Sequence, residues 1–240
     1  MIKEALQYLV SLKENKAYEI HGDIYSDREL VRVEPHVDRP EPLTVTGLDS
    51  LAQLIRHEAD LVDAQPIFVR VDGPRSVTAF SSWDDTMTRD RLYKAECDAP
   101  AFQTGWMDHE EAVIKLRSMF ETDEDSDLNY VLDLLSRISR GSSVFSSDNG
   151  VTQTVEARQG VALSQRVAVR PRVALRPYRT FLEVLQPKSE FLLRLDGEGR
   201  VGLLEADGGM WRMDAKKGIA WYLEDKLKEL VEAGRVVVMV

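Results

Sequence analysis

Six arginines lie in one stretch of an otherwise acidic chain: Arg158, Arg166, Arg170, Arg172, Arg176 and Arg179. Between the first and the last of them the sequence holds no lysine and no carboxylate, whereas the 240-residue chain as a whole carries a net charge of -10. A guanidinium group forms bidentate pairs with carboxylates and with phosphates. The stretch is therefore the strongest candidate for a binding surface.

Two kinds of partner fit these arginines. Beside Tyr178 and Phe181, arginines on a sheet are typical of a groove that binds single-stranded nucleic acid through backbone contacts and base stacking. The other possible partners are carboxylates, from the same chain or from a neighbouring copy. An acidic loop provides five of them: Glu121, Asp123, Glu124, Asp125 and Asp127. Because the net charge opposes binding to nucleic acid, the sequence favours pairing with protein.

The residues that would carry catalysis do not gather in the sequence. The four histidines are scattered over His21, His36, His57 and His109, and Cys97 is the only cysteine. No glycine-rich phosphate loop is present, and no serine stands in a strand–turn–helix pattern. We therefore expect no catalytic residues, no metal site and no cofactor. An unrecognised hydrolase ranks third, after the two binding hypotheses given below.

Periodicity predicts the elements that would position these residues. Helical spacing favours helices over 2–14, 48–61 (with Thr46 as its cap), 108–120, 127–140 and 215–233. Alternation favours early strands over 18–20, 30–33, 67–71, 77–81 and 92–97. A later series covers 143–147, 151–157, 161–169, 172–176, 181–185, 190–195, 201–206 and 235–240, with Asn149-Gly150 as a hairpin signal.

This order predicts an α+β fold. A helix-rich part with mixed strands spans 1–141, and a mainly antiparallel sheet packed by a C-terminal helix spans 142–240. The two parts form either separate domains or one continuous domain. The segment 236–240 is the longest apolar run, which is too short to cross a membrane, and residues 1–16 do not resemble a signal peptide. With its single cysteine, the chain is expected in the cytoplasm.

The order of segments resembles the YfdQ-like family of phage and prophage proteins. The resemblance rests on the segments 48–57, Arg91-Leu92-Tyr93, Ala99-Pro100-Ala101-Phe102 to Trp106, the helix through Leu132 and Leu135, and the sheet from Val144 to Leu195. It implies a phage-encoded accessory protein of the bacterial cytoplasm that self-assembles. It implies no catalytic residues.

The leading hypothesis is thus a non-enzymatic, phage-related protein that forms a homo-oligomer, as a ring or a cage. The arginine stretch of one copy would meet the acidic loop of the next, and 236–240 would supply apolar surface. The alternative is an accessory protein that binds single-stranded nucleic acid through Arg158 to Arg179.

Overall fold

The computed structural model describes residues 2–11, 17–20, 23–26, 41–60, 65–84, 87–137, 143–148, 153–158 and 164–240. The chain divides into two compact units, Met1–Arg39 and Pro40–Val240. The first unit contains helix α1 (Ile2–Ser11) and an antiparallel hairpin of β1 (Ala17–Ile20) and β2 (Asp23–Ser26). Of the predicted elements, the strand 30–33 lies outside the described residues.

A five-stranded mixed sheet forms the first layer of the second unit. Its order is β14-β4-β5-β6-β3. The strands are β3 (Leu43–Thr46), β4 (Ile67–Gly73), β5 (Ser76–Phe80), β6 (Arg91–Glu96) and β14 (Val236–Met239). The two outer strands, β14 and β3, run parallel to their neighbours, while β4, β5 and β6 form an antiparallel meander.

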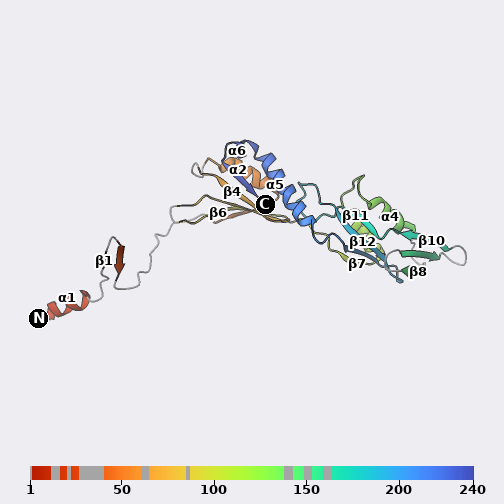
Figure 1. The fold of residues 1–240 in the computed structure, drawn as a ribbon, viewed down its shortest axis with the longest axis horizontal. Coiled ribbons are helices and arrows are strands. Elements are labelled where there is room, and N and C mark those ends of the chain that lie inside the picture. Colours follow the sequence, from red (N-terminus) through yellow and green to blue (C-terminus); the bar gives the residue numbers. More distant parts are fainter. Residues whose placement is uncertain are drawn as a thin grey trace. The chain divides into compact units, whose positions relative to one another are not determined.

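Three helices pack on one face of this sheet (Figure 1): α2 (Leu48–Glu58), α5 (Trp211–Lys226) and α6 (Lys228–Glu232). Alternate residues of β4 point toward them, so that Ile67, Val69 and Val71 are buried. They share one core with Leu51 of α2 and Leu223 of α5. The apolar stripes of α2 and α5 are thereby removed from water, whereas α6 has no fully buried residue.

A second core forms around an antiparallel sheet of order β11-β12-β13-β7. Its strands are β7 (Gly105–Met107), β11 (Arg172–Leu175), β12 (Ser189–Leu195) and β13 (Val201–Glu205). Helices α3 (His109–Ser118) and α4 (Leu128–Arg137) contribute Leu116 and Leu135 to its core. A separate three-stranded sheet, β10-β9-β8, joins β8 (Ser143–Asp148), β9 (Gln153–Arg158) and β10 (Ser164–Val169).

The predicted α+β class is confirmed, with a C-terminal helix packed against a sheet. That sheet is the five-stranded mixed one, because Ile219 and Leu223 of α5 join its core. Both cores draw residues from each side of position 141. Among the described residues, no helix is long and apolar enough to cross a membrane.

The predicted strand 181–185 is wrong. This segment is a turn, and only Phe181 and Val184 of its apolar residues are buried. The side chain of Gln186 holds it, because its Nε2 donates to the carbonyl oxygens of Phe181 (3.0 Å) and Val184 (3.2 Å). A side-chain amide can in this way satisfy backbone carbonyl oxygens that would otherwise bond to a neighbouring strand.

Helix α2 is capped from a distant part of the chain, and the predicted cap by Thr46 is wrong. The N-cap residue is Gly47, and Glu183 Oε1 accepts a hydrogen bond from the backbone N–H of Leu48 (2.7 Å). Gly47 has φ of 85°, and an added Cβ would lie 2.5 Å from that same carboxylate oxygen. Glycine is therefore favoured at this position by its backbone angle, and a Cβ here would displace the carboxylate of Glu183 that caps the helix.

Replacing Glu183 should measure this cap. We expect Glu183→Ala to lower the free energy of unfolding by about 0.5–2 kcal/mol, the usual cost of losing an N-cap. Urea unfolding of the purified protein would show this, with Glu224→Ala on the exposed side of α5 as the control. Equal stability of the two variants would contradict the capping role.

Tyr93 should make the protein sensitive to alkali. Its side chain is buried, and its hydroxyl donates to Glu58 at the end of α2. Burial, and then the bond to Glu58, raise the pKa of Tyr93. A raised folded-state pKa contributes stability that is fully present below the unfolded value of about 10 and is lost as the pH rises above it.

We therefore expect Tyr93→Phe to flatten the fall in stability above about pH 10. Unfolding by urea across that pH range would measure the slope, and Tyr18→Phe, at an exposed tyrosine, is the control. An unchanged slope in Tyr93→Phe would reject the assignment.

Candidate functional site

The six arginines of the predicted patch do not share one strand. Arg158 ends β9 and Arg166 lies in β10, and the side chains of both fall outside the described residues. Strand β10 ends at Val169 and β11 begins at Arg172. The chain therefore leaves one sheet and enters another at Arg170 and Pro171, so that a single arginine-lined strand face does not form.

The acidic loop meets this stretch within the same chain. Asp127 Oδ1 lies 3.0 Å from Arg170 Nη1, and Asp123 Oδ2 lies 3.0 Å from Arg176 Nε. Asp125 pairs with Lys188 at 3.2 Å. The sequence allowed carboxylates from the same chain or from a neighbouring copy. At these positions the carboxylates come from the same chain.

Asp127 has a structural task at the start of α4. Its Oδ2 accepts the N–H of Ala174 (2.9 Å), and its own N–H donates to the carbonyl of Ala174 (2.9 Å). Arg170 completes this junction, because its guanidinium lies 3.7 Å from the centre of the Tyr130 ring. The loop and β11 are therefore held together by backbone bonds as well as by charge.

The other two acids of the loop contribute less to this pairing. Glu121 donates its backbone N–H to the carbonyl of Arg176 (2.8 Å), while its buried Oε2 has no hydrogen-bond partner among the described residues. Glu124 is exposed. Neither side chain forms an ion pair with the described arginines of the stretch, so the contact depends on Asp123 and Asp127.

Arg179 is the buried member of the stretch, with 4% of its side chain exposed. Its Nη1 lies 2.7 Å from Glu205 Oε1, and its Nη2 donates to Ser189. The guanidinium stacks on the ring of Trp211 at 4.0 Å. Burial lowers the pKa of Arg179, and the nearby carboxylate of Glu205 opposes that shift.

Arg172 is the contrasting case, because 70% of its side chain is exposed and its nearest carboxylate, on Glu190, is 3.5 Å away. An exposed pair of this kind contributes little to stability. Of the described arginines of the stretch, Arg170, Arg176 and Arg179 thus have structural partners, whereas Arg172 is mainly solvated.

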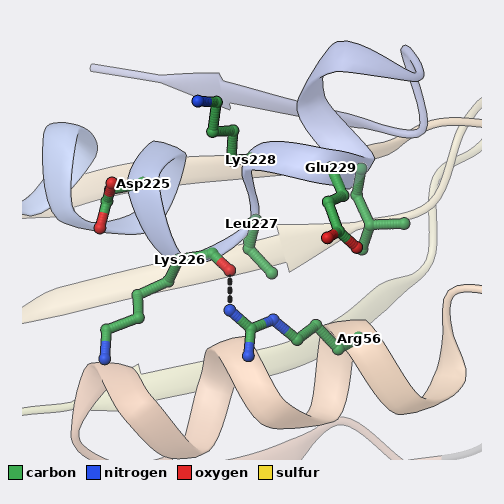
Figure 2. Close-up of a pocket in the computed structure, with 7 residues that line it drawn as sticks. Arg56, Asp225, Lys226, Leu227, Lys228 and Glu229 are labelled. Atoms are coloured by element: carbon green, nitrogen blue, oxygen red, sulfur yellow. Dashed lines mark hydrogen bonds between the residues drawn. The ribbon is translucent and has the colours of Figure 1, made fainter.

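A cavity of about 480 Å³ lies where α5 passes into α6 (Figure 2). Arg56 of α2 donates to the carbonyl oxygen of Lys226, which caps the end of α5. Lys226 and Lys228 extend from opposite sides of this turn (Figure 2), and Lys226 lies 3.2 Å from Asp49. Arg56 therefore stabilises a helix end, and Lys226 and Lys228 form ion pairs with Asp49 and Glu232, so each of these cations has a partner within the protein.

The candidates for acid–base chemistry also have structural contacts. His109 Nε2 lies 2.8 Å from the carbonyl oxygen of Leu135 and links α3 to α4. Cys97 is half-buried and unpaired as a thiol. In the described ranges, no three His, Cys, Asp or Glu side chains gather as they would around a metal ion.

The outer edge of the five-stranded sheet is the remaining candidate surface. Strand β14 has β4 on one side and is the end strand of the sheet on the other. Val237, Met239 and Val240 are 38%, 37% and 56% exposed. The sequence had indicated this segment as apolar surface, and the structure places it on an edge.

Comparisons with protein-family models, with curated proteins and with solved structures found no match to this chain.

Removing Arg179 should cost far more stability than removing Arg172. Arg179→Ala would leave Glu205 without its partner in a largely buried place, so we expect a loss of about 3 kcal/mol. Arg172→Ala should change the free energy of unfolding by less than about 0.5 kcal/mol. Urea unfolding of both variants measures the contrast, and equal losses would show that Arg179 has no special role.

Proposed function

We propose that the chain is a non-enzymatic accessory protein that assembles into a homo-oligomer through strand β14. The observation that supports this most directly is the apolar composition of β14, which is an end strand of the five-stranded sheet. The segment 236–240 carries no charge, no proline and no glycine, although edge strands usually carry such features to prevent pairing with another chain. An apolar edge of this kind favours association.

The backbone of β14 indicates how the edges would meet. The carbonyl oxygen of Arg235 accepts the N–H of Ile67 (2.9 Å), so Arg235 faces β4. Since successive residues of a strand alternate in direction, Val237 and Met239 also bond toward β4. The N–H and C=O groups of Val236 and Val238 then point away from β4, to the side on which the described residues place no further strand, and there they can bond to another chain.

Two copies can satisfy these groups together. Antiparallel pairing of β14 with its equivalent about a twofold axis uses the same surface on both copies and closes after two subunits. The exposed side chains of Val237, Met239 and Val240 would lose contact with water in the same step. A ring or cage needs a second interface, for which the opposite edge β3, with Leu43 51% exposed, is the candidate.

Charge has a smaller part in this proposal than the sequence suggested. Asp123 and Asp127, which were expected to meet arginines of another copy, are engaged with Arg176 and Arg170 of their own. The apolar edge, not the arginine stretch, is therefore the proposed contact. The same ion pairs count against the arginine stretch as a groove for nucleic acid.

The biological setting belongs to the proposal as well. The resemblance to YfdQ-like proteins supports a phage-encoded accessory role in the bacterial cytoplasm, and a single cysteine suits a reducing compartment.

The oligomer should depend on the outward N–H of Val238. Val238→Pro removes that donor without cutting the bonds from β14 to β4, so we expect it to convert the oligomer to a monomer of 27.2 kDa. Met239→Lys, which places a charge beside the edge, should weaken assembly in the same direction. Light scattering coupled to size exclusion at micromolar concentration measures the mass.

Leu185→Lys is the matched control, because it places the same charge on another exposed apolar residue. Circular dichroism would confirm that each variant is folded. A wild-type protein that runs as a 27.2 kDa monomer, or folded Val238→Pro that remains fully assembled, would overturn the proposal.

A further inference from the structure

The face of the five-stranded sheet that points away from α2, α5 and α6 has an unusual composition. In the part of the chain that the structure describes, no helix covers this face (Figure 1). Because β4 buries Ile67, Val69 and Val71 on the helix side, the residues between them lie on the other side. These are Phe68, Arg70 and Asp72.

Aromatic rings gather at one end of this face. Phe68 on β4 lies directly opposite Phe80 on β5, and Trp83 follows in the next loop with 55% of its surface exposed. The guanidinium of Arg89 lies 4.3 Å from the centre of the Phe68 ring and 4.4 Å from that of Trp83. Arg70 lies 4.9 Å from the ring of Phe80.

A row of polar residues crosses the middle of the same face. The register places Arg70 opposite Thr78, and Thr78 opposite Lys94, on three neighbouring strands. Both cations have acid partners nearer the β4–β5 hairpin, Arg70 with Asp72 (2.6 Å) and Lys94 with Glu96. These are surface ion pairs, and such pairs are weak enough for a phosphate to compete with the carboxylate.

Hydrogen bonds join the two described segments 81–84 and 87–90, which carry Trp83 and Arg89. Asp84 accepts from the N–H (2.9 Å) and the hydroxyl (2.7 Å) of Thr88. Arg89 Nη1 donates to the carbonyl of Ser81 (3.0 Å), and Ser81 and Asp90 are joined backbone to backbone (2.9 Å). The guanidinium of Arg89, which lies against the rings of Phe68 and Trp83, is thus held in place before any partner binds, which lowers the entropic cost of binding.

We propose that this face binds single-stranded nucleic acid, with bases stacked on the cluster of Trp83, Arg89, Phe68 and Phe80 and phosphates bound by Arg70 and Lys94. Stacking on aromatic rings and on guanidinium planes, combined with cations that follow the backbone, is the chemistry by which proteins hold single strands. A duplex hides its base faces, so it cannot use the rings. The inference goes beyond self-assembly and does not depend on it.

The test is the fluorescence anisotropy of a labelled oligo(dT), and of the matching oligo(U), of about 20 nucleotides at low salt. Trp83→Ala should weaken binding by about fivefold or more, the effect of losing one stacked base. Arg70→Gln with Lys94→Gln should reduce the slope of log affinity against log salt by about 2, one for each lost phosphate contact.

Two control variants separate this face from other surfaces. Trp221→Ala removes a tryptophan that is 69% exposed on α5, whose buried residues pack on the opposite face of the sheet, and it should leave affinity unchanged. Arg172→Gln removes an exposed guanidinium of the arginine stretch and should also have no effect. Circular dichroism and urea unfolding show whether each variant keeps its fold.

Several outcomes would overturn the proposal. They are full affinity in folded Trp83→Ala, loss of affinity in Arg172→Gln instead, or no binding of either oligonucleotide at low salt. Binding of an oligo-glutamate peptide that is lost in the Arg70/Lys94 variant, without binding of the oligonucleotides, would show that the face takes an acidic protein. The mass of the particle does not enter any of these readouts, so failure here leaves self-assembly to be judged separately.

Discussion

The buried guanidinium of Arg179 fixes the relation between the two cores of the unit Pro40–Val240. It binds Ser189 and Glu205 on neighbouring strands of one sheet and stacks on Trp211, the first residue of the helix that packs on the other. The next residues carry the chain across: Thr180 donates to the carbonyl of Pro74, and Phe181 enters the first core. A charge this deeply buried tolerates little displacement, because any shift leaves it without compensation.

The burial of Arg179 could not be predicted from composition alone. Arginines concentrated in an acidic chain suggest a common surface, yet Arg170 stabilises the start of α4, Arg176 holds the acidic loop and Arg179 lies in the interior. What they share is the planar guanidinium, which can stack on a ring and donate hydrogen bonds to several acceptors at once. The sequence showed where these groups are, but burial depends on strands that are distant in the chain.

Local pattern predicted the helices and most strands, because amphipathic periodicity is itself the cause of their burial. Helix α2 and strands β4, β5 and β6 lie within a few residues of their predicted bounds. One failure has a local cause, in the residue that follows the segment, and another has a nonlocal cause. The segment 181–185 has the composition of a strand but is held as a turn by Gln186, and α2 is capped by Glu183, which is 135 residues away from Leu48 in sequence. Neither contact leaves a signal in the segment that it shapes.

The open face of the five-stranded sheet could not be predicted from the sequence either, because it depends on contacts between segments that are distant in the chain. Alternation in β4 shows that Phe68 and Arg70 share a side, but not that the helices cover only the other side or that Phe80 lies opposite. Two arginine–tryptophan contacts illustrate the difference: the buried Arg179 stacks on the half-buried Trp211 at 4.0 Å, whereas Arg89 lies 4.4 Å from the ring of Trp83, which is 55% exposed. The same interaction stabilises the fold in one place and is accessible to a partner in the other. Only a pair that is exposed to solvent can contact a ligand. In an arginine-rich chain, the exposure of each arginine therefore decides, more than the number of arginines, where a partner can bind.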